Sequence, residues 1–191
     1  MKKQSSLLLI LMLLLVLAGC GAKSAPTEPP ELTVTNAQGT SITAMGGSYD
    51  WDYEAGGGQR TGAIACGMHP LDETLRDSTP ALEMPIAVSA SFYYTVTLDF
   101  GDCAPDSVIL RYWNEQCWGD TQAKAEKLTV QRQDDGTYTV ELFPSVGIFE
   151  VDAQWDAEDY CGRAFYSFCT KAKGSEALHT GAVLSIGESE D

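Results

Sequence analysis

The ten residues GIFEVDAQWD, at positions 147–156, alternate apolar and polar side chains with a period of two. In an extended chain, side chains two positions apart share one face. The alternation therefore predicts a β-strand over 147–156 with one buried face and one solvated face. We expect Phe149, Val151, Ala153 and Trp155 on the buried face, and Glu150, Asp152, Gln154 and Asp156 on the solvated face.

The same alternation recurs along most of the chain. The segment CGRAFYSFC (161–169) follows after the short connection AEDY (157–160), so these two strands should form a β-hairpin. Turn signals such as EAGGG (54–58) and DDG (134–136) separate the earlier segments. Those segments are ELTVT (31–35), SITA (41–44), GSYDWDY (47–53), QRTGAIAC (59–66), FYYTVTLDF (92–100), DSVILRYWN (106–114), EKLTVQRQ (126–133) and TYTVEL (137–142).

Roughly eight to ten short strands at this spacing are typical of an antiparallel β-sandwich. Their order resembles that of immunoglobulin-like bacterial domains, so the expected fold class is an all-β, immunoglobulin-like sandwich. Such sandwiches carry many unrelated functions, and the resemblance therefore implies a scaffold without implying an activity. Residues 67–90 interrupt the alternation and contain three prolines, so this segment should be a long loop or hold one short helix near residues 71–76.

The N-terminal residues are typical of a targeting signal. Residues 7–18 are continuously apolar and follow Lys2 and Lys3. As a helix rising about 1.5 Å per residue, this run reaches roughly 18 Å, which is short of a hydrocarbon core of about 30 Å. The following LAGC (17–20) resembles the lipobox of bacterial lipoproteins. That resemblance implies cleavage before Cys20 and attachment of a diacylglyceryl group to its thiol; an ordinary cleaved signal peptide and an uncleaved signal anchor are the alternatives.

These features divide the chain into four parts. We expect a signal peptide over 1–19, the lipidated Cys20 with a flexible proline-rich linker over 20–31, the sandwich over 32–170, and a tail over 171–191 with room for one strand at 183–186. The expected location is the extracytoplasmic face of a bacterial membrane, held by the lipid. The segments HPL, TPALEM, RYWNEQCWGD and VDAQWDAEDYCGRAFYSF also resemble small Gram-positive lipoproteins, a likeness that implies fold and location but no activity.

The charge balance restricts the partners. The chain has 27 acidic and 12 basic residues, for a net charge of -15. Nucleic-acid binding draws its affinity from lysine and arginine, so a nucleic-acid partner is not expected. Adsorption onto an anionic lipid surface is disfavoured for the same reason, so the lipid anchor is the expected link to the membrane.

The cysteines are odd in number once Cys20 carries lipid. A strand from Cys161 to Cys169 would hold them roughly 26 Å apart at about 3.3 Å per residue, too far for a disulfide, which needs Cα atoms within about 7 Å. The immunoglobulin-like order implies that strand 106–114 lies antiparallel to strand 147–156. On that resemblance the expected disulfides are Cys103 with Cys161 and Cys117 with Cys169, leaving Cys66 free, while other arrangements, including all thiols reduced, stay open.

Catalytic and metal-binding signatures are not found in the sequence. The histidines are His69 and His179, and neither a CxxC nor an HExxH motif occurs. The acidic segment DWDYE (50–54) fails the EF-hand pattern, because Ala55 and Thr61 stand where glycine and glutamate are required. We therefore predict no cofactor, no metal and no catalytic residue, with a hydrolase site assembled only in space as the less favoured alternative.

Aromatic residues are the best binding candidates. Tyr112 and Trp113 lie at one strand end, and Trp118 precedes the turn-forming Gly119, so these rings could form a ligand surface. Burial in the core is the competing interpretation, as we expect for Trp51 and Trp155. The predicted function is a binding module for a protein, peptide or cell-wall glycan, with a structural or envelope-sensing lipoprotein acting through a membrane partner as the alternative.

Overall fold

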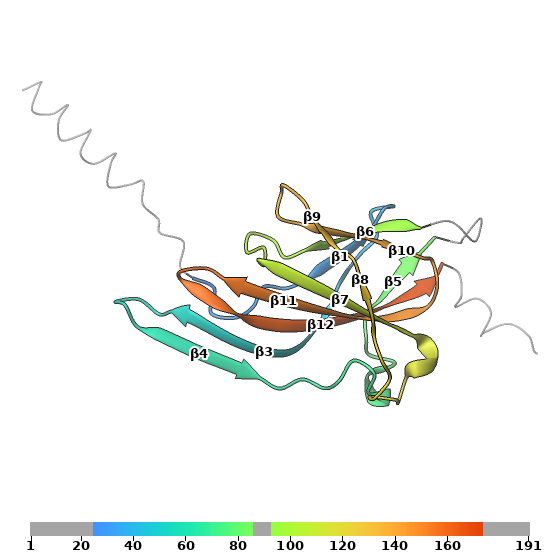
Figure 1. Ribbon diagram of the computed structural model, residues 1–191, viewed down its shortest axis with the longest axis horizontal. Coiled ribbons are helices and arrows are strands. Elements are labelled where there is room, and N and C mark those ends of the chain that lie inside the picture. The colour runs from blue at the N-terminus through green and yellow to red at the C-terminus, as the bar shows by residue number, and fades with distance from the viewer. Residues whose placement is uncertain (1–24, 86–92, 174–191) are drawn as a thin grey trace, which may run out of the picture.

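The computed structural model describes residues 25–85 and 93–173, and these residues form two β-sheets packed face to face (Figure 1). The predicted all-β sandwich is confirmed. The leader and the strand predicted at 183–186 lie outside the described residues. Within the described part of the chain, no helix has the length and hydropathy needed to span a membrane.

The smaller sheet, sheet A, has five strands. Neighbouring strands in it are antiparallel, so each inward-facing residue meets an inward-facing partner. In spatial order they are β2 (Ser41–Thr43), β1 (Thr33–Asn36), β6 (Tyr94–Asp99), β10 (Tyr138–Leu142) and β9 (Gln131–Arg132).

The larger sheet, sheet B, has seven strands and contains the segment GIFEVDAQWD as a central strand. Its main path is β4 (Arg60–Ala65), β3 (Met45–Glu54), β12 (Tyr160–Ala172), β11 (Gly147–Asp156), β7 (Ser107–Asn114) and β8 (Glu126–Leu128). The seventh strand, β5 (Ala81–Met84), pairs in parallel with the end of β12.

The sequence places most strands correctly. Strand β11 has the predicted bounds, and it pairs with β12 in the predicted hairpin. The segment 126–133 differs, because it divides into β8 of sheet B and β9 of sheet A. Strand β5 falls within the irregular segment 67–90 and was not predicted, since four residues between prolines carry little periodic signal. The predicted short helix is a 3₁₀ turn, Glu73–Leu75, capped by Asp72.

The main core lies between the two sheets. The predicted buried face of β11 contributes Phe149, Val151, Ala153 and Trp155, all at most 3% exposed. Trp51 from β3 is fully buried and meets the ring of Trp155 edge-on, with 5.2 Å between the ring centroids. The interior positions predicted for both tryptophans are therefore confirmed.

A second, smaller cluster covers the outer face of sheet B at one end. It consists of Leu71, Trp113 and Ile148. The 3₁₀ turns Glu73–Leu75 and Glu115–Cys117 (η1 and η2) lie at this end of the molecule (Figure 1). This end is called the loop end below, and the end with the β3–β4 and β11–β12 hairpins is called the hairpin end.

The proline-rich segment is not a free linker over its whole length. The Trp51 indole Nε1 donates a hydrogen bond of 2.9 Å to the carbonyl of Pro26, and the Tyr166 hydroxyl donates one of 2.7 Å to the carbonyl of Pro30. Residues 26–31 therefore pack against the sandwich, and the folded unit begins before Leu32, where the domain boundary was expected.

The predicted disulfides are not formed. All five cysteines of the described residues are free thiols. Strand β7 runs antiparallel to β11, as expected, but it pairs with β11 directly, and β11 therefore lies between β7 and β12. Residues that face each other on β7 and β12 are two strand spacings apart, about 9.6 Å, beyond the range of about 7 Å that a disulfide bridges. Neither Cys103, which precedes β7, nor Cys117, in the turn after β7, comes within bonding distance of its predicted partner. Neither Cys103 with Cys161 nor Cys117 with Cys169 is bonded.

Candidate functional site

The three aromatic residues predicted as a ligand surface do not form one. Adjacent positions on β7 place Tyr112 and Trp113 on opposite faces of sheet B. Trp113 is only 5% exposed, and its Nε1 donates a hydrogen bond of 2.9 Å to the carbonyl of Ala123. Trp118 packs, half-buried, against the cluster around Leu71. The predicted row is therefore divided, and Tyr112 lines a pocket that faces solvent.

That pocket is a cavity of about 230 Å³ at the open edge of the sandwich. We call it the aromatic pocket. Strand β8 belongs to sheet B and β10 to sheet A, so backbone hydrogen bonds between strands do not join the two sheets at this edge. The apolar lining comes from Tyr93, Tyr112, Leu128, Leu142, Phe143 and Phe149, and the polar lining from Glu126, Glu141 and Ser145.

Two rings of the pocket are unusually exposed. Tyr93 is 59% and Phe143 is 40% exposed, and their rings stand edge to face with centroids 6.0 Å apart. Tyr112 and Phe149 lie deeper, with ring centroids 5.3 Å apart. Moving a large aromatic side chain out of water is favourable. Exposed rings at the mouth of a cavity therefore indicate a surface that contacts a ligand.

Carboxylates accompany these rings. Glu126 and Glu141 are exposed side chains that line the same pocket. The Thr95 hydroxyl donates a hydrogen bond of 2.6 Å to Oε1 of Glu141, which restrains that carboxylate beside the rings. The pocket thus combines apolar walls with negative charge, a combination suited to a ligand that has an apolar stem and a positive head.

Sequence reasoning missed Tyr93 and Phe143. Tyr93 directly precedes β6, and Phe143 directly follows β10 and precedes Pro144. A signal was present, because an aromatic residue beyond the last paired position of a strand has no partner strand to cover it, and a following proline ends the ladder. What the sequence did not show is that the two strand ends are neighbours, since β6 pairs with β10.

A second hollow, the outer groove, lies on the outer face of sheet B, with a volume of about 330 Å³. Its polar groups hold the protein's own backbone. The Ser48 Oγ accepts a hydrogen bond of 3.0 Å from the Gly67 amide, and Nδ1 of His69 accepts one of 3.2 Å from the Leu71 amide. Ser48 and His69 both line this groove, yet within the described residues no hydrogen bond joins them. The arrangement fixes residues 67–71 against β3.

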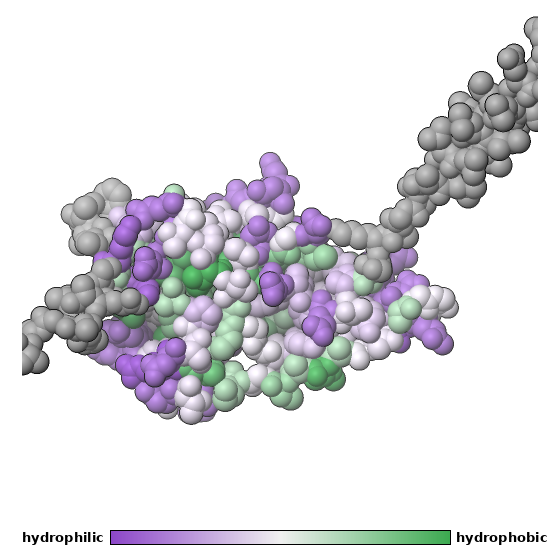
Figure 2. Space-filling model, turned by 180° about the vertical axis from the view of Figure 1, so that it is seen from behind, coloured by the Kyte–Doolittle hydropathy of each residue, from purple (hydrophilic) through white to green (hydrophobic). Residues whose placement is uncertain are grey.

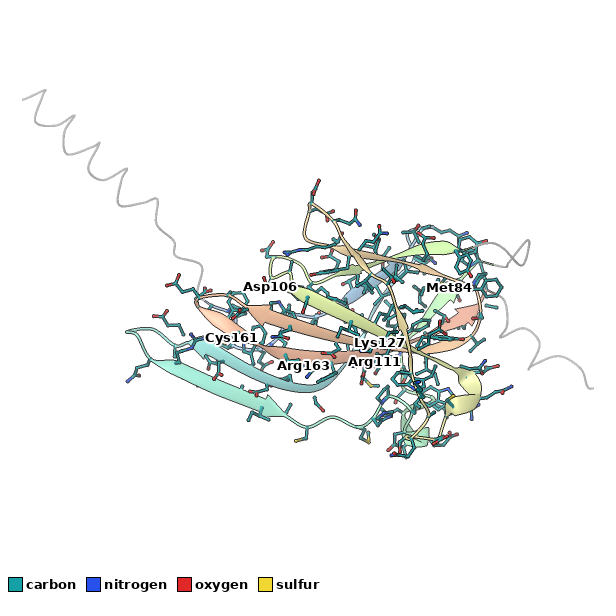
Figure 3. All side chains as sticks on the ribbon, viewed as in Figure 1. Met84, Asp106, Arg111, Lys127, Cys161 and Arg163 are labelled. Carbon is teal, nitrogen blue, oxygen red and sulfur yellow. The ribbon has the colours of Figure 1, made fainter. Side chains whose placement is uncertain are left out.

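An ion-pair network lies beside the outer groove. Asp152, only 4% exposed, accepts hydrogen bonds from Arg111 on β7 and Arg163 on β12, and Arg111 also pairs with Glu150 at 2.6 Å. Figure 3 shows Arg111 and Arg163 over this face of the sheet. Burial opposes the charge on Asp152, but hydrogen bonds from both guanidinium groups outweigh it and lower the pKa of the carboxyl group. The network satisfies its own charges and holds three strands together.

Two further observations limit the chemistry. In residues 25–85 and 93–173, no group of three or more histidine, cysteine, aspartate or glutamate side chains is placed to hold a metal ion. Asp50, Asp52 and Glu54 are exposed on the solvated side of β3, as the alternation predicts.

Figure 2 shows the reverse side of the molecule, where hydrophobic residues appear in small separate areas among polar ones. An apolar contact with a ligand on that side would therefore cover only a small area.

Comparisons with protein-family models, with curated proteins and with solved structures find no match to this chain. Its function must therefore be argued from its own residues.

Proposed function

We propose that this protein is a lipid-anchored, extracytoplasmic binding module whose aromatic pocket takes a lysine or arginine side chain from a basic segment of a partner protein. The observation that carries the proposal is the pairing of exposed rings, Tyr93 and Phe143, with the carboxylates of Glu126 and Glu141 around one cavity. In this proposal the protein binds and makes or breaks no covalent bond.

The chemistry of the pocket matches such a side chain in two ways. Lysine and arginine bury an apolar stem while the charged head stays near solvent, and the walls around Tyr112 offer apolar contact for that stem. A cation over the face of an aromatic ring gains about 0.5–2 kcal/mol, and a carboxylate adds a charge-assisted hydrogen bond. Here Glu141 is already held in place by Thr95.

The size of the cavity supports a single side chain as the occupant. Its volume of about 230 Å³ is below the roughly 300–1,000 Å³ of cavities that enclose a whole small molecule. A glycan is better served by a row of exposed rings, and the row predicted from Tyr112, Trp113 and Trp118 is divided between faces. We therefore favour a polypeptide over a glycan.

The charge of the whole chain supports a basic partner. A net charge of -15 attracts a positively charged segment over several ångströms and raises its rate of encounter. That attraction is not selective by itself, so the aromatic pocket has to supply the selectivity.

The location rests on the LAGC segment at 17–20. Lipid on Cys20 would tether the domain durably only with two or three acyl chains, because one chain binds a bilayer marginally. Flotation of vesicles with the wild-type protein and with a chain that begins at Gly21, which lacks both the apolar leader and Cys20, tests this part: the wild-type protein should float and the shortened chain should stay in the soluble fraction.

The binding itself is tested by fluorescence anisotropy with labelled peptides. A peptide of alternating lysine and glycine should bind the protein, and a peptide of alternating glutamate and glycine should not. Binding of the lysine peptide that disappears in Tyr93→Ala, which changes no charge, supports the pocket. Equal binding by wild-type protein and Tyr93→Ala would show that the attraction is only the general negative charge.

A further inference from the structure

The segment before the first strand is held on the domain by backbone contacts. Its carbonyls at Pro26 and Pro30 accept hydrogen bonds from Trp51 and Tyr166, whose side chains are at most 5% exposed. The chain then enters the core at Leu32, which is fully buried and whose carbonyl accepts a hydrogen bond of 2.9 Å from the Ala44 amide. Buried donors fix the segment, because leaving either donor unpaired would cost about 1–3 kcal/mol.

These contacts give the segment a direction along the sandwich. Trp51 pairs with Gly162, two residues from the start of β12, and its ring stacks on Tyr160 at 5.5 Å between centroids. Tyr166 lies further along the same strand. The segment therefore starts near the hairpin end and runs toward the middle of the domain, and in Figure 1 its first described residues lie at the end with the β11–β12 hairpin.

The distance from the anchor is short. Pro26 lies six positions after Cys20, and a fully extended chain covers at most about 3.6 Å per residue, or roughly 20 Å. If residues 26–31 were free, that reach would be about twice as long and the domain could turn in any direction.

The aromatic pocket lies at the other end. Phe149 and Tyr112 are near the loop end of β11 and β7, while the β11–β12 turn is at the hairpin end. The ten residues of β11 span about 30 Å at roughly 3.3 Å per residue. A domain held at its hairpin end thus carries the pocket at the far end.

We infer that residues 26–31 act as a docked strap that holds the hairpin end of the domain beside the lipid surface and presents the aromatic pocket away from it. This inference rests on the lipid anchor of the proposed function. It adds an orientation: the membrane-facing surface is formed by the β3–β4 and β11–β12 hairpins. Glu54, Glu158 and Asp159 lie there, and anionic headgroups repel these carboxylates, so only the lipid enters the bilayer.

The test is paramagnetic broadening of amide NMR signals. The full lipidated protein is placed in nanodiscs of phosphatidylcholine that contain a gadolinium-chelating lipid. Signals from 56–58 and 157–159 should lose most of their intensity, whereas signals from Phe143, Ser145 and Val146 should keep theirs. Equal losses at the two ends, or greater loss at 143–146, would overturn the inference.

A lengthened chain provides the matched control. A flexible glycine-serine insert of about 12 residues after Lys23 adds roughly 20 Å of average reach without touching the folded residues. In this variant the difference between the two ends should disappear; a difference that persists would show that the short connection from Cys20 to the docked strap is not its cause. Failure of the wild-type protein to float would overturn the anchor itself, and is distinguished from failure of the orientation by the flotation assay.

Discussion

Arg163 holds both carboxylate oxygens of Asp152, with its Nε 2.6 Å from Oδ1 and its NH2 2.6 Å from Oδ2. Arg163 lies on β12 and Asp152 on β11, and Arg111 on β7 donates a third hydrogen bond to Asp152 at 2.7 Å. One nearly buried carboxylate therefore joins three adjacent strands on the face of sheet B that turns away from the core. The alternation of GIFEVDAQWD predicts a solvated face at this position, and the network explains why Asp152 is nonetheless buried.

Replacing Asp152 should destabilise the fold. Asp152→Ala leaves two guanidinium groups without their shared partner, and we expect a loss of about 2 kcal/mol, below the 3–5 kcal/mol typical of fully buried pairs because Arg163 is half-exposed. Urea unfolding measures the loss. Asp50→Ala, at an exposed position of β3, should change stability by less than about 0.5 kcal/mol. Equal effects of the two substitutions would mean that the network contributes nothing.

The contribution of Asp152 should depend on pH in one direction. Its pKa in the folded protein lies below the ordinary value of 3.8, so the folded state binds a proton less readily than the unfolded state. The stabilisation is fully present above the unfolded-state pKa and is lost as the pH falls through the folded-state pKa. The stability difference between wild-type protein and Asp152→Asn should therefore be constant near neutral pH and shrink below about pH 4. A difference that grows in acid would contradict the assignment.

The cysteines should differ in reactivity. Cys66 is exposed on the chain beyond β4, whereas burial raises the pKa of the Cys169 thiol to about 12, which suppresses the reactive thiolate. Maleimide labelling followed by mass spectrometry should modify Cys66 first and Cys169 last. A cross-linked peptide joining Cys117 to Cys169 in an unreduced digest would contradict the assignment of both residues as free thiols.

Removing the Tyr166 hydroxyl should loosen the strap. Tyr166→Phe keeps the ring in the core but takes away the hydrogen bond to Pro30. We expect cleavage after Glu31 by a glutamate-specific protease to become several-fold faster, with a small loss of stability of about 1 kcal/mol. Tyr138→Phe, which removes the hydroxyl bond to Pro105 elsewhere in the core, should leave cleavage after Glu31 unchanged. Equal cleavage of wild-type protein and Tyr166→Phe would mean that the bond does not hold the segment.

Local alternation predicted most of the fold because sandwich strands bury one face, as β11 does with Phe149, Val151 and Trp155. The missing strand, β5, depends on a parallel partner far along the chain, and local pattern does not reveal such a partner. The same reason explains the disulfide error, since periodicity does not show that β11 separates β7 from β12.

The candidate site was only partly predictable. Tyr112 was named from the sequence, but its partners Tyr93, Phe143 and Glu141 come together through the pairing of β6 with β10 and the crossing of the chain from β8 to β9. The docked strap was missed because its composition, rich in proline and small polar residues, is that of a flexible linker. Its order comes from Trp51 and Tyr166, which belong to distant strands.

The most direct measurement compares two variants of equal charge for binding of the lysine-glycine peptide. Glu141→Gln removes a carboxylate from the aromatic pocket, and Glu158→Gln removes one from the β11–β12 hairpin at the other end of the domain. If the pocket recognises a basic side chain, fluorescence anisotropy should show binding weakened about tenfold in Glu141→Gln and by less than about twofold in Glu158→Gln. Equal weakening of binding in the two variants would contradict the proposal that the aromatic pocket is the binding site.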